Sequence, residues 1–437
     1  GSIFKMATCL NLICKLKKST RLFCSVSIKQ PNGNCGYSSD VGSYEPYDNQ
    51  NERRSSVRSI PLNSELHEVL MHSKPDNPPI SKLTQVSILG LPNAGKSTLA
   101  NQIMKWKICT VSKKVHTTRK NCRAILVEDD TQIVFLDTPG LIGKKEMQRH
   151  KLEKSLLVDP ENSLIDSNLL LYVHDVSCKR TRWKIDPKVL KLLYKYQEKE
   201  AVLVLNKIDL IRDKLRILDL TDELTEGVVG GIESNKSTRL TLKRKKRSEV
   251  DKEELFKKME DEKEKSVAGI KRLEEAVDHK NLSDDELFER VKDLKGWRNF
   301  SSVFMVSALE DDGVDDLREY LVKSAKPSPW RYSSSLVTDI DPKEIVLQTV
   351  KEKLLDHLPM ELPYVISPRI EFWDVSPSGL LSLVLSLRPK SKHWVKLIVG
   401  SGGARIKQIS QEAEQDLRNT FRYDVRLKII VEDPKSK

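Results

Sequence analysis

Residues 90–97 read Gly-Leu-Pro-Asn-Ala-Gly-Lys-Ser and follow a short apolar run at 86–89. A glycine-rich turn between a strand and a helix, here predicted at 98–105, lets backbone N–H groups point at phosphate oxygens. Lys96 can neutralise β- and γ-phosphate charge, the Ser97 hydroxyl can hold Mg²⁺, and the helix N-terminus favours the same anion. The predicted phosphate site comprises Gly90, Asn93, Ala94, Gly95, Lys96, Ser97 and Thr98.

Asp137-Thr138-Pro139-Gly140 ends a second predicted strand, at 133–136. A carboxylate there can hold Mg²⁺ through water, and the Gly140 N–H can contact the γ-phosphate. This tetrapeptide alone is often only a turn, but its place downstream of Lys96 favours the functional interpretation. Between them lies Thr117-Thr118-Arg119, where a loop would bring a Thr hydroxyl, by our prediction that of Thr118, to Mg²⁺. The predicted metal ligands are Ser97, Thr118 and Asp137, and the predicted catalytic groups are Lys96, Thr118 and Gly140.

Asn206-Lys207-Ile208-Asp209 follows a predicted strand at 201–205 and indicates which base is bound. The Asp209 carboxylate can accept from N1–H and the 2-amino group of guanine, whereas adenine would leave it unpaired. Lys207 can lay its stem over the base. Ser307-Ala308-Leu309 follows a further strand at 303–306, and its backbone N–H can reach the guanine carbonyl. These sites in series predict GTP and GDP, with Mg²⁺, as the ligands.

Short apolar strands alternate with helices from residue 83 onwards, which predicts an α/β fold with a doubly wound, mostly parallel sheet over 83–326. A charged stretch at 230–300 interrupts it and is predicted to be an insertion. For 249–295 we expect a solvated charged helix. For the basic run 243–247, contact with RNA phosphate competes with a solvated face and with a nuclear-import signal. The predicted strands are 86–89, 124–127, 133–136, 169–173, 201–205 and 303–306, with helices at 188–197 and 314–323.

A second, smaller α+β domain is predicted at 335–437. It should contain a helix at 343–357, strands at 365–374 and 379–387, a helix at 405–419 and a last strand at 424–431. Gly400-x-x-Gly403 joins two helices there, and such a loop can clamp a nucleic-acid backbone because glycines permit close approach. Ile398, Ile406 and Ile409 have the spacing of a helix-packing face that would floor the groove. The predicted RNA-binding residues are Lys396, Gly400, Ser401, Gly402, Gly403, Arg405 and Lys407, with Lys390 and Lys392 nearby.

The composition of the 437-residue chain favours an anionic partner. Its net charge is +12 and its pI is near 9.1, which suits nucleic acid, an anionic membrane surface or a targeting peptide. No apolar run approaches the roughly 18–20 residues of a membrane helix. The seven cysteines form no Cys-x-x-Cys pattern, so we expect a reducing compartment, no disulfide framework and no zinc site.

Residues 1–39 contain six Lys or Arg and no Asp or Glu. This composition is typical of a mitochondrial or plastid transit peptide, with a disordered basic tail as the alternative. Residues 40–82 are polar and rich in Ser, Asn and Pro, which predicts a linker. One amphipathic turn at 62–71 could pack on the next domain.

The four nucleotide motifs and the C-terminal module resemble those of the translation-factor-like GTPases, and within them the Era family. The resemblance covers 83–432, apart from the insertion. It rests on 90–99, on Val-His-Thr-Thr-Arg at 115–119, on 137–140, on 206–209 and on a module that looks like the family's type II KH domain. Leu141 stands where many GTPases carry a catalytic Gln, so the resemblance implies slow intrinsic hydrolysis. Asn93 matches the Asn that helps hold K⁺ in related GTPases, and a bound K⁺ is a hypothesis here.

The resemblance implies that the protein binds the 3′ region of single-stranded small-subunit rRNA. It further implies a role in assembly of the small ribosomal subunit and, with the transit peptide, in the mitochondrial matrix. Peripheral contact with the inner mitochondrial membrane is a further hypothesis. The alternatives are an RNA-binding protein with a degenerate nucleotide domain, a large-subunit assembly GTPase and a tRNA-modifying GTPase. A single nucleotide site, the C-terminal KH-like module and the absence of a terminal cysteine motif argue against the last two.

Overall fold

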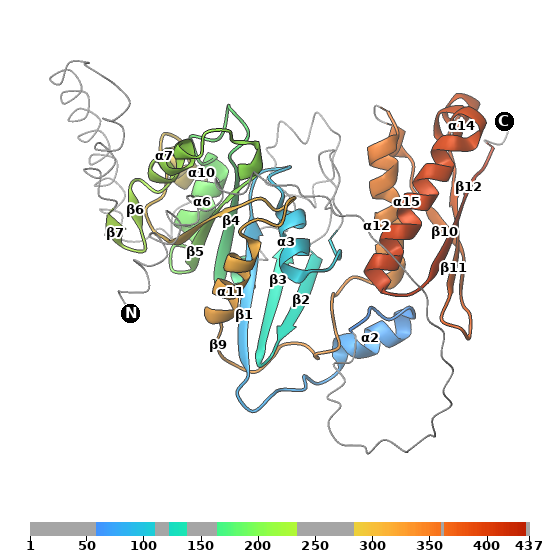
Figure 1. The fold of residues 1–437 in the computed structure, drawn as a ribbon, viewed down its shortest axis with the longest axis horizontal. Coiled ribbons are helices and arrows are strands. Elements are labelled where there is room, and N and C mark those ends of the chain that lie inside the picture. Colours follow the sequence, from blue (N-terminus) through green and yellow to red (C-terminus); the bar gives the residue numbers. More distant parts are fainter. Residues whose placement is uncertain (1–57, 110–121, 138–163, 234–283, 360–361, 434–437) are drawn as a thin grey trace, which may run out of the picture. The chain divides into compact units, whose positions relative to one another are not determined.

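A computed structural model describes residues 58–109, 122–137, 164–233, 284–359 and 362–433 (Figure 1). The predicted transit peptide, Thr117-Thr118-Arg119, Gly140, Leu141 and the basic run 243–247 therefore lie outside the described residues.

The nucleotide domain is built on one mixed sheet whose order is β2-β3-β1-β4-β5-β8, with β9 pairing to β1 (Figure 1). β1, β3, β4, β5 and β8 run parallel, and β2 is antiparallel to β3. The predicted doubly wound, mostly parallel sheet is thus confirmed, and each predicted strand lies inside an observed one. The strands are β1 (Lys82–Leu89), β2 (Cys122–Glu128), β3 (Thr131–Asp137), β4 (Leu169–Asp175), β5 (Glu200–Asn206), β8 (Phe300–Val306) and β9 (Lys326–Pro327).

Alternate residues of the central strands enter two separate cores, because successive side chains of a strand point to opposite faces. In β4, Leu171 and Val173 join the core that includes helices α3 (Lys96–Met104) and α11 (Val314–Lys323). Leu170 and Tyr172 join the core on the other face, beneath the remaining helices. Those helices are α6 (Pro187–Lys195), α7 (Leu215–Leu224) and α10 (Asp284–Val291). Both faces of the sheet are therefore covered, as a parallel sheet requires.

The structure corrects the prediction for the C-terminal end of the insertion. We expected a solvated charged helix over 249–295, but α10 buries Leu287 and Val291, and Trp297 after it is 1% exposed. The backbone of Lys295 also accepts a hydrogen bond from Ile185 at 2.8 Å. These three apolar positions are four and six residues apart and lie among many charged residues, so the average composition of the segment hid its packed face. The predicted insertion begins near a short hairpin of β6 (Val228–Val229) and β7 (Ile232–Glu233).

The C-terminal domain packs helices against a three-stranded sheet of order β10-β11-β12. β10 and β11 are antiparallel, whereas β11 and β12 are parallel, because two helices intervene before β12. One predicted strand is wrong at its start: residues 362–365 form a helical turn, and β10 begins only after Pro368. The elements are α12 (Pro342–His357), α13 (Leu362–Val365), β10 (Arg369–Val375), β11 (Leu381–Leu387), α14 (Lys392–Val399), η5 (Ser401–Gly403), α15 (Ala404–Phe421) and β12 (Val425–Val431).

The second half of the predicted linker is packed rather than free. Helix α2 (Ser64–His72) begins where the Asn63 side chain accepts from the Glu65 N–H at 2.8 Å. Buried His67 contacts the Thr338 carbonyl at 3.0 Å, and the Arg58 guanidinium donates to carbonyls of Ile125 and Leu336. Arg58 and His67 therefore attach this part of the predicted linker to the nucleotide domain and to the segment that leads into the C-terminal domain. Val57–Lys437 forms one compact unit.

Candidate functional site: a guanine-nucleotide site and a nucleic-acid clamp

The phosphate loop lies at the carboxyl end of β1, directly before α3. Gly95 caps α3 in a left-handed conformation (φ 93°) and offers no side chain to the first turn. A Cβ at Gly95 would lie 2.3 Å from the Asn206 amide nitrogen, so this position requires glycine. Lys96 is buried at 7% exposure, and its ammonium donates to the carbonyls of Gly90 and Leu91 at 3.2 and 3.1 Å. These oxygens stand in for phosphate oxygens, so the Lys96 ammonium is held ready for an anion.

Asn206 joins the phosphate loop to the base-recognition loops. Its amide donates to the Ala94 carbonyl at 2.8 Å, and its carbonyl accepts from the N–H groups of Lys207 and Ala308 at 2.8 and 3.0 Å. The side chain is 2% exposed and its polar atoms are satisfied by these contacts. The structure therefore brings together the predicted loops at 90–97, 206–209 and 307–309, which are separated in sequence.

The predicted base-specificity residue, Asp209, is exposed and is the middle residue of the short helix η3 (Ile208–Leu210). Its carboxylate accepts a hydrogen bond from the Ser307 hydroxyl at 2.6 Å, and Ser307 itself is buried. This bond orients the Asp209 carboxylate. Leu309 is 74% exposed, so its backbone rather than its side chain suits contact with a base.

Asp175 is a functional residue that the sequence reasoning missed. It ends β4, and its carboxylate lies 2.6 Å from the Lys207 ammonium, which also donates to the Asn93 carbonyl at 2.7 Å. Burial favours the protonated acid, but the hydrogen bonds from Lys207 and Ser177 outweigh it and lower the pKa of Asp175 below its usual value. The charged pair thus fixes the Lys207 stem beside the phosphate loop. The position of Asp175 at the carboxyl end of a parallel strand was a signal that could have found it.

The donor set suits Mg²⁺, a hard cation that prefers oxygen ligands. Half-buried Ser97 lies in the first turn of α3, and the backbone of Asp137 is the register partner of Ile88, next to the loop. Of the predicted metal ligands, Ser97 and Asp137 are thus brought to one edge of the sheet, while Thr118 lies outside the described residues. Through the part of the chain that the structure covers, no group of three or more His, Cys, Asp or Glu residues is placed to hold a metal ion.

The second predicted site also has the geometry of a phosphate clamp. α14 ends at Gly400, and after the turn η5 the long helix α15 begins with its N-terminus facing the loop. Gly402 has a φ of 58°, and a Cβ added there would meet nothing within 4 Å, so the loop surface is open to an approaching ligand. Ile398 and Ile409 are fully buried and Ile406 packs beside them, which confirms the predicted helix-packing face.

The basic residues around this loop differ in their contacts with the protein. The Arg405 guanidinium donates to the Leu397 carbonyl at the end of α14, so it braces the loop from within. Four lysines are instead exposed around the groove and available to phosphate: Lys390, Lys392, Lys396 and Lys407.

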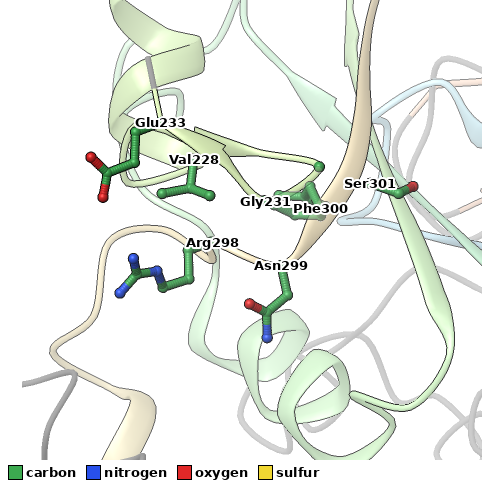
Figure 2. Close-up of a pocket in the computed structure, with 8 residues that line it drawn as sticks. Val228, Gly231, Glu233, Arg298, Asn299, Phe300 and Ser301 are labelled. Carbon is green, nitrogen blue, oxygen red and sulfur yellow. The ribbon is translucent and has the colours of Figure 1, made fainter. Parts of the chain in front are cut away.

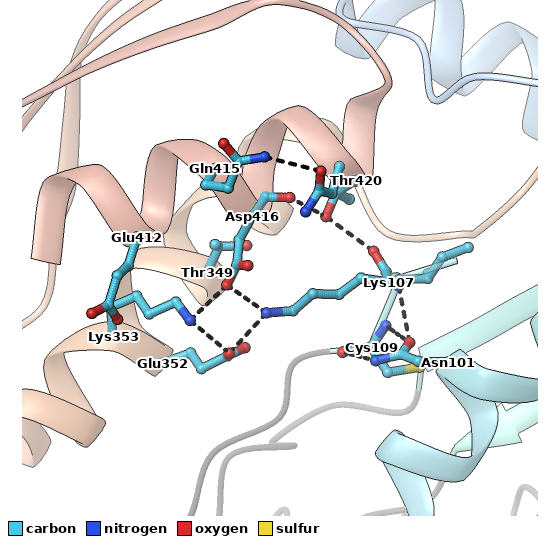
Figure 3. A network of polar contacts seen from close by, with 12 residues as sticks. Asn101, Lys107, Cys109, Thr349, Glu352, Lys353, Glu412, Gln415, Asp416 and Thr420 are labelled. Atoms are coloured by element: carbon cyan, nitrogen blue, oxygen red, sulfur yellow. Dashed lines mark hydrogen bonds and ion pairs between the residues drawn. The ribbon is translucent and has the colours of Figure 1, made fainter. Parts of the chain in front are cut away.

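A network of polar contacts connects the two domains next to α3 (Figure 3). The Lys107 ammonium lies 3.0 Å from a Glu352 oxygen of α12 and 2.5 Å from an Asp416 oxygen of α15. The Trp106 indole donates to the Thr420 carbonyl at 2.8 Å, and the Arg422 guanidinium lies 3.6 Å from the centre of the indole ring. The segment that follows the phosphate-loop helix is therefore held by the C-terminal domain.

A pocket of about 430 Å³ lies elsewhere, between the β6–β7 hairpin and the start of β8 (Figure 2). Arg298, Asn299 and Glu233 line it. Phe300 pairs with Ala201 near the beginning of β5, so the pocket is at the edge of the sheet opposite to the nucleotide loops. It takes no part in the site described above. No helix in the described ranges is both long and apolar enough to cross a membrane.

Comparison with known proteins agrees with this geometry. A family model described as "50S ribosome-binding GTPase" matches residues 85–207, and one described as "KH domain" matches 393–435. The chain is 42% identical over 364 residues to "GTPase Era, mitochondrial" of Danio rerio, covering 83% of this chain and 78% of the relative. The protein of the same name in Caenorhabditis elegans is 28% identical over 362 residues, covering 81% and 90%.

Two solved structures share the fold. Aquifex aeolicus Era bound to GDP and AlF₄⁻ superposes with a TM-score of 0.54 at 22% identity, over 80% of this chain and 93% of that one. Era in complex with MgGDPNP and nucleotides 1506–1542 of 16S ribosomal RNA gives a TM-score of 0.51 at 21% identity and the same coverage. With a relative 42% identical over most of its length, a P-loop nucleotide domain and a C-terminal KH domain, the chain belongs to the Era family of GTPases, which bind GTP and GDP with Mg²⁺ and hydrolyse GTP.

Proposed function

We propose that this GTPase binds the 3′ region of single-stranded small-subunit rRNA in its KH groove and acts in assembly of the mitochondrial small ribosomal subunit. The observation that carries the proposal is the open Gly400–Gly403 loop, at the N-terminus of α15, with exposed lysines around it. Glycines and a helix N-terminus suit a nucleic-acid backbone, and the lysines suit its phosphates. An Era structure holding a 16S rRNA fragment supports the choice of RNA.

The location and the slow turnover belong to the same proposal. The relatives named mitochondrial and the acid-free segment 1–39 support import into the matrix. The net charge of +12 supports a peripheral contact with the inner mitochondrial membrane. Leu141 cannot orient a water as Gln does, so intrinsic hydrolysis should be slow.

We further propose that K⁺ supplies positive charge near the phosphates at Asn93. The Asn93 side chain is exposed, and its backbone has a φ of 60°. Its own carbonyl is engaged by Lys207, so the side-chain amide oxygen is the group that would face the ion.

The alternative of an RNA-binding protein with a degenerate nucleotide domain has little support. Lys96, Asn206 and Asp209 all take part in the contacts expected of a working guanine-nucleotide site. A single nucleotide domain argues against the double-GTPase factors of large-subunit assembly, and a C-terminal KH domain in place of a terminal cysteine motif argues against a GTPase of tRNA modification.

Crosslinking the protein to RNA in cells and sequencing the bound fragments tests the proposal directly. We expect reads concentrated at the 3′ end of mitochondrial small-subunit rRNA, and recovery of mainly cytosolic messenger RNA would contradict it. In vitro, Gly402→Asp should lower affinity for that RNA at least tenfold, because it places a negative charge in the clamp. GTP binding should be unchanged.

Gly379→Asp is the matched control for that variant. Gly379 also has a positive φ, 83°, and open space around its Cβ position, but it lies in the β10–β11 turn. That turn is near the other end of α15, and an 18-residue helix is about 27 Å long. An equal loss of RNA binding in both variants would show that the loss reflects damage to the domain rather than to the clamp.

A further inference from the structure

We propose that Cys109 and Cys122 form a redox site, in which a reversible disulfide regulates the nucleotide domain. The two sulfurs are 3.4 Å apart, and the side chains are 3% and 4% exposed. Neither residue is in a disulfide. A disulfide needs its sulfurs about 2.05 Å apart, so they must approach by roughly 1.4 Å.

The two cysteines are attached to the two sides of the nucleotide site. The Cys109 N–H donates to the Asn101 side-chain oxygen at 2.8 Å, and the Cys109 carbonyl accepts from the Asn101 amide at 2.7 Å. Asn101 belongs to α3, whose N-terminus carries Lys96 and Ser97. Cys109 is therefore held directly by the phosphate-loop helix.

Cys122 is the first residue of β2 and is the register partner of Asp137, the last residue of β3. A disulfide would therefore tie the phosphate-loop helix to the strand that pairs with the predicted Mg²⁺ carboxylate. Along the sequence it would close a ring that includes Thr117 and Thr118. Guanine-nucleotide switches work through changes in the segments around the γ-phosphate. A covalent tie between these two backbone points should hinder such a change and slow hydrolysis.

The chemistry needs a two-electron oxidant, for which we propose a hydroperoxide. One thiolate attacks a peroxide oxygen, which gives a sulfenic acid and releases water after proton transfer. The second thiol attacks the sulfenic sulfur, the S–S bond forms, and a second water leaves. Two thiols are oxidised by the loss of two electrons and two protons, and the peroxide is reduced to two waters. A dithiol reductant reverses the reaction by thiol–disulfide exchange.

Peptide mapping of the full chain tests the site. Trypsin places Cys109 in the peptide 108–113 and Cys122 in the peptide 121–123, so only a disulfide joins them. After treatment with hydrogen peroxide and blocking of the remaining thiols, we expect to detect the two peptides joined by a disulfide. The joined species should disappear after treatment with dithiothreitol. Full recovery of both peptides in the blocked form would overturn the proposal. A link from Cys109 or Cys122 to any other cysteine would do so as well.

GTP hydrolysis tests the regulatory part. We expect the oxidised wild-type protein to hydrolyse GTP at least fivefold more slowly than the reduced protein, with recovery in dithiothreitol. Cys178→Ser, which removes the half-buried thiol elsewhere in the domain, should behave like wild type. Cys109→Ser and Cys122→Ser should retain full activity in peroxide. Disulfide formation without a change in rate would overturn the regulatory part, and peptide mapping of wild type does not depend on whether the variants fold.

Discussion

Replacing Lys107 by Met should destabilise the protein far more than its place near the surface suggests. Its ammonium is shared between Glu352 and Asp416, whose side chains are only 3% and 18% exposed (Figure 3). Lys353 lies 2.7 Å from Asp416 but 3.6 Å from Glu352, so the Glu352 carboxylate would lose its closer cation. Methionine keeps the length of the stem and removes only the charge.

The size of the effect follows from burial. Removing one partner of a fully buried pair costs about 3–5 kcal/mol. Lys107 is 28% exposed, and Lys353 partly compensates, so we expect about 2 kcal/mol. Lys105→Met is the matched control. Its ion pair with Asp315 has a similar length, 3.0 Å, but the two side chains are 55% and 71% exposed, and such pairs contribute less than about 1 kcal/mol.

Urea unfolding of the full chain, followed by tryptophan fluorescence, measures the difference. The double variant K107M/E352Q should recover part of the loss, because it neutralises the carboxylate left without its closer cation. Equal destabilisation by K107M and K105M would refute the reasoning. A further loss of stability on adding E352Q would also refute it.

The contribution of Asp416 to the free energy of unfolding should decrease at low pH. Burial alone would raise the pKa of Asp416, but the hydrogen bonds from Lys107 and Lys353 lower it below its usual value. A lowered pKa contributes stability above the unfolded pKa of about 3.9, and this stability is lost as pH falls through the folded value. The difference in stability between wild type and K107M should therefore be full near pH 7 and should shrink below about pH 4.

Three further predictions concern the nucleotide site. Asp209→Asn should weaken GTP binding about 100-fold, because two hydrogen bonds from guanine to a charged acceptor are lost. Calorimetry measures the affinity for GTP, and the affinity for RNA should not change. Unchanged GTP binding would contradict the role of Asp209 in binding guanine. GTP hydrolysis should be faster in K⁺ buffer than in Na⁺ buffer. Asn93→Gly should abolish this difference, and glycine can adopt the φ of 60° found at this position. Equal rates in the wild-type protein would exclude a role for K⁺ in hydrolysis. Asp175→Asn should raise the Kd for GTP threefold to tenfold, since it releases Lys207 from its charged partner. Ser177→Ala, which removes only a second hydrogen bond to Asp175, should have a smaller effect, and the reverse order would contradict that role.

The central sheet could be predicted because its strands are buried runs that end in motifs with a known chemistry. The motif order also located Asn206 and Ser307 at one edge, since the carboxyl ends of parallel strands meet there. Sequence reasoning failed where local pattern is ambiguous. The short apolar run at 362–365 is compatible with a helix or a strand, and the structure makes it a helical turn. The strand begins only after Pro368, because proline restricts the backbone of the residue before it and has no N–H to donate.

The contacts between domains could not be predicted, for a different reason. Lys107 is 245 residues from Glu352 and 309 from Asp416, and nothing in one charged side chain identifies a distant partner. Many other lysines of the chain are exposed to solvent, and in the sequence Lys107 cannot be distinguished from them. Asp175 is an intermediate case, because its place in the sheet could have been used, but its pairing with Lys207 required the structure.

Two helices connect the nucleotide site with the proposed RNA site. α3 begins at the nucleotide phosphate loop and α15 begins at the Gly400–Gly403 loop, so each N-terminus is placed where it would favour a phosphate. Their other ends meet: Trp106, just after α3, donates to Thr420 of α15 and packs under Arg422. A shift of either helix along its axis, at one phosphate, must therefore be taken up at this junction or passed to the other helix. Trp106 is only 8% exposed, but a pocket of about 450 Å³ beside it is lined by residues of α3 and α15, so the junction has room to take up part of such a shift.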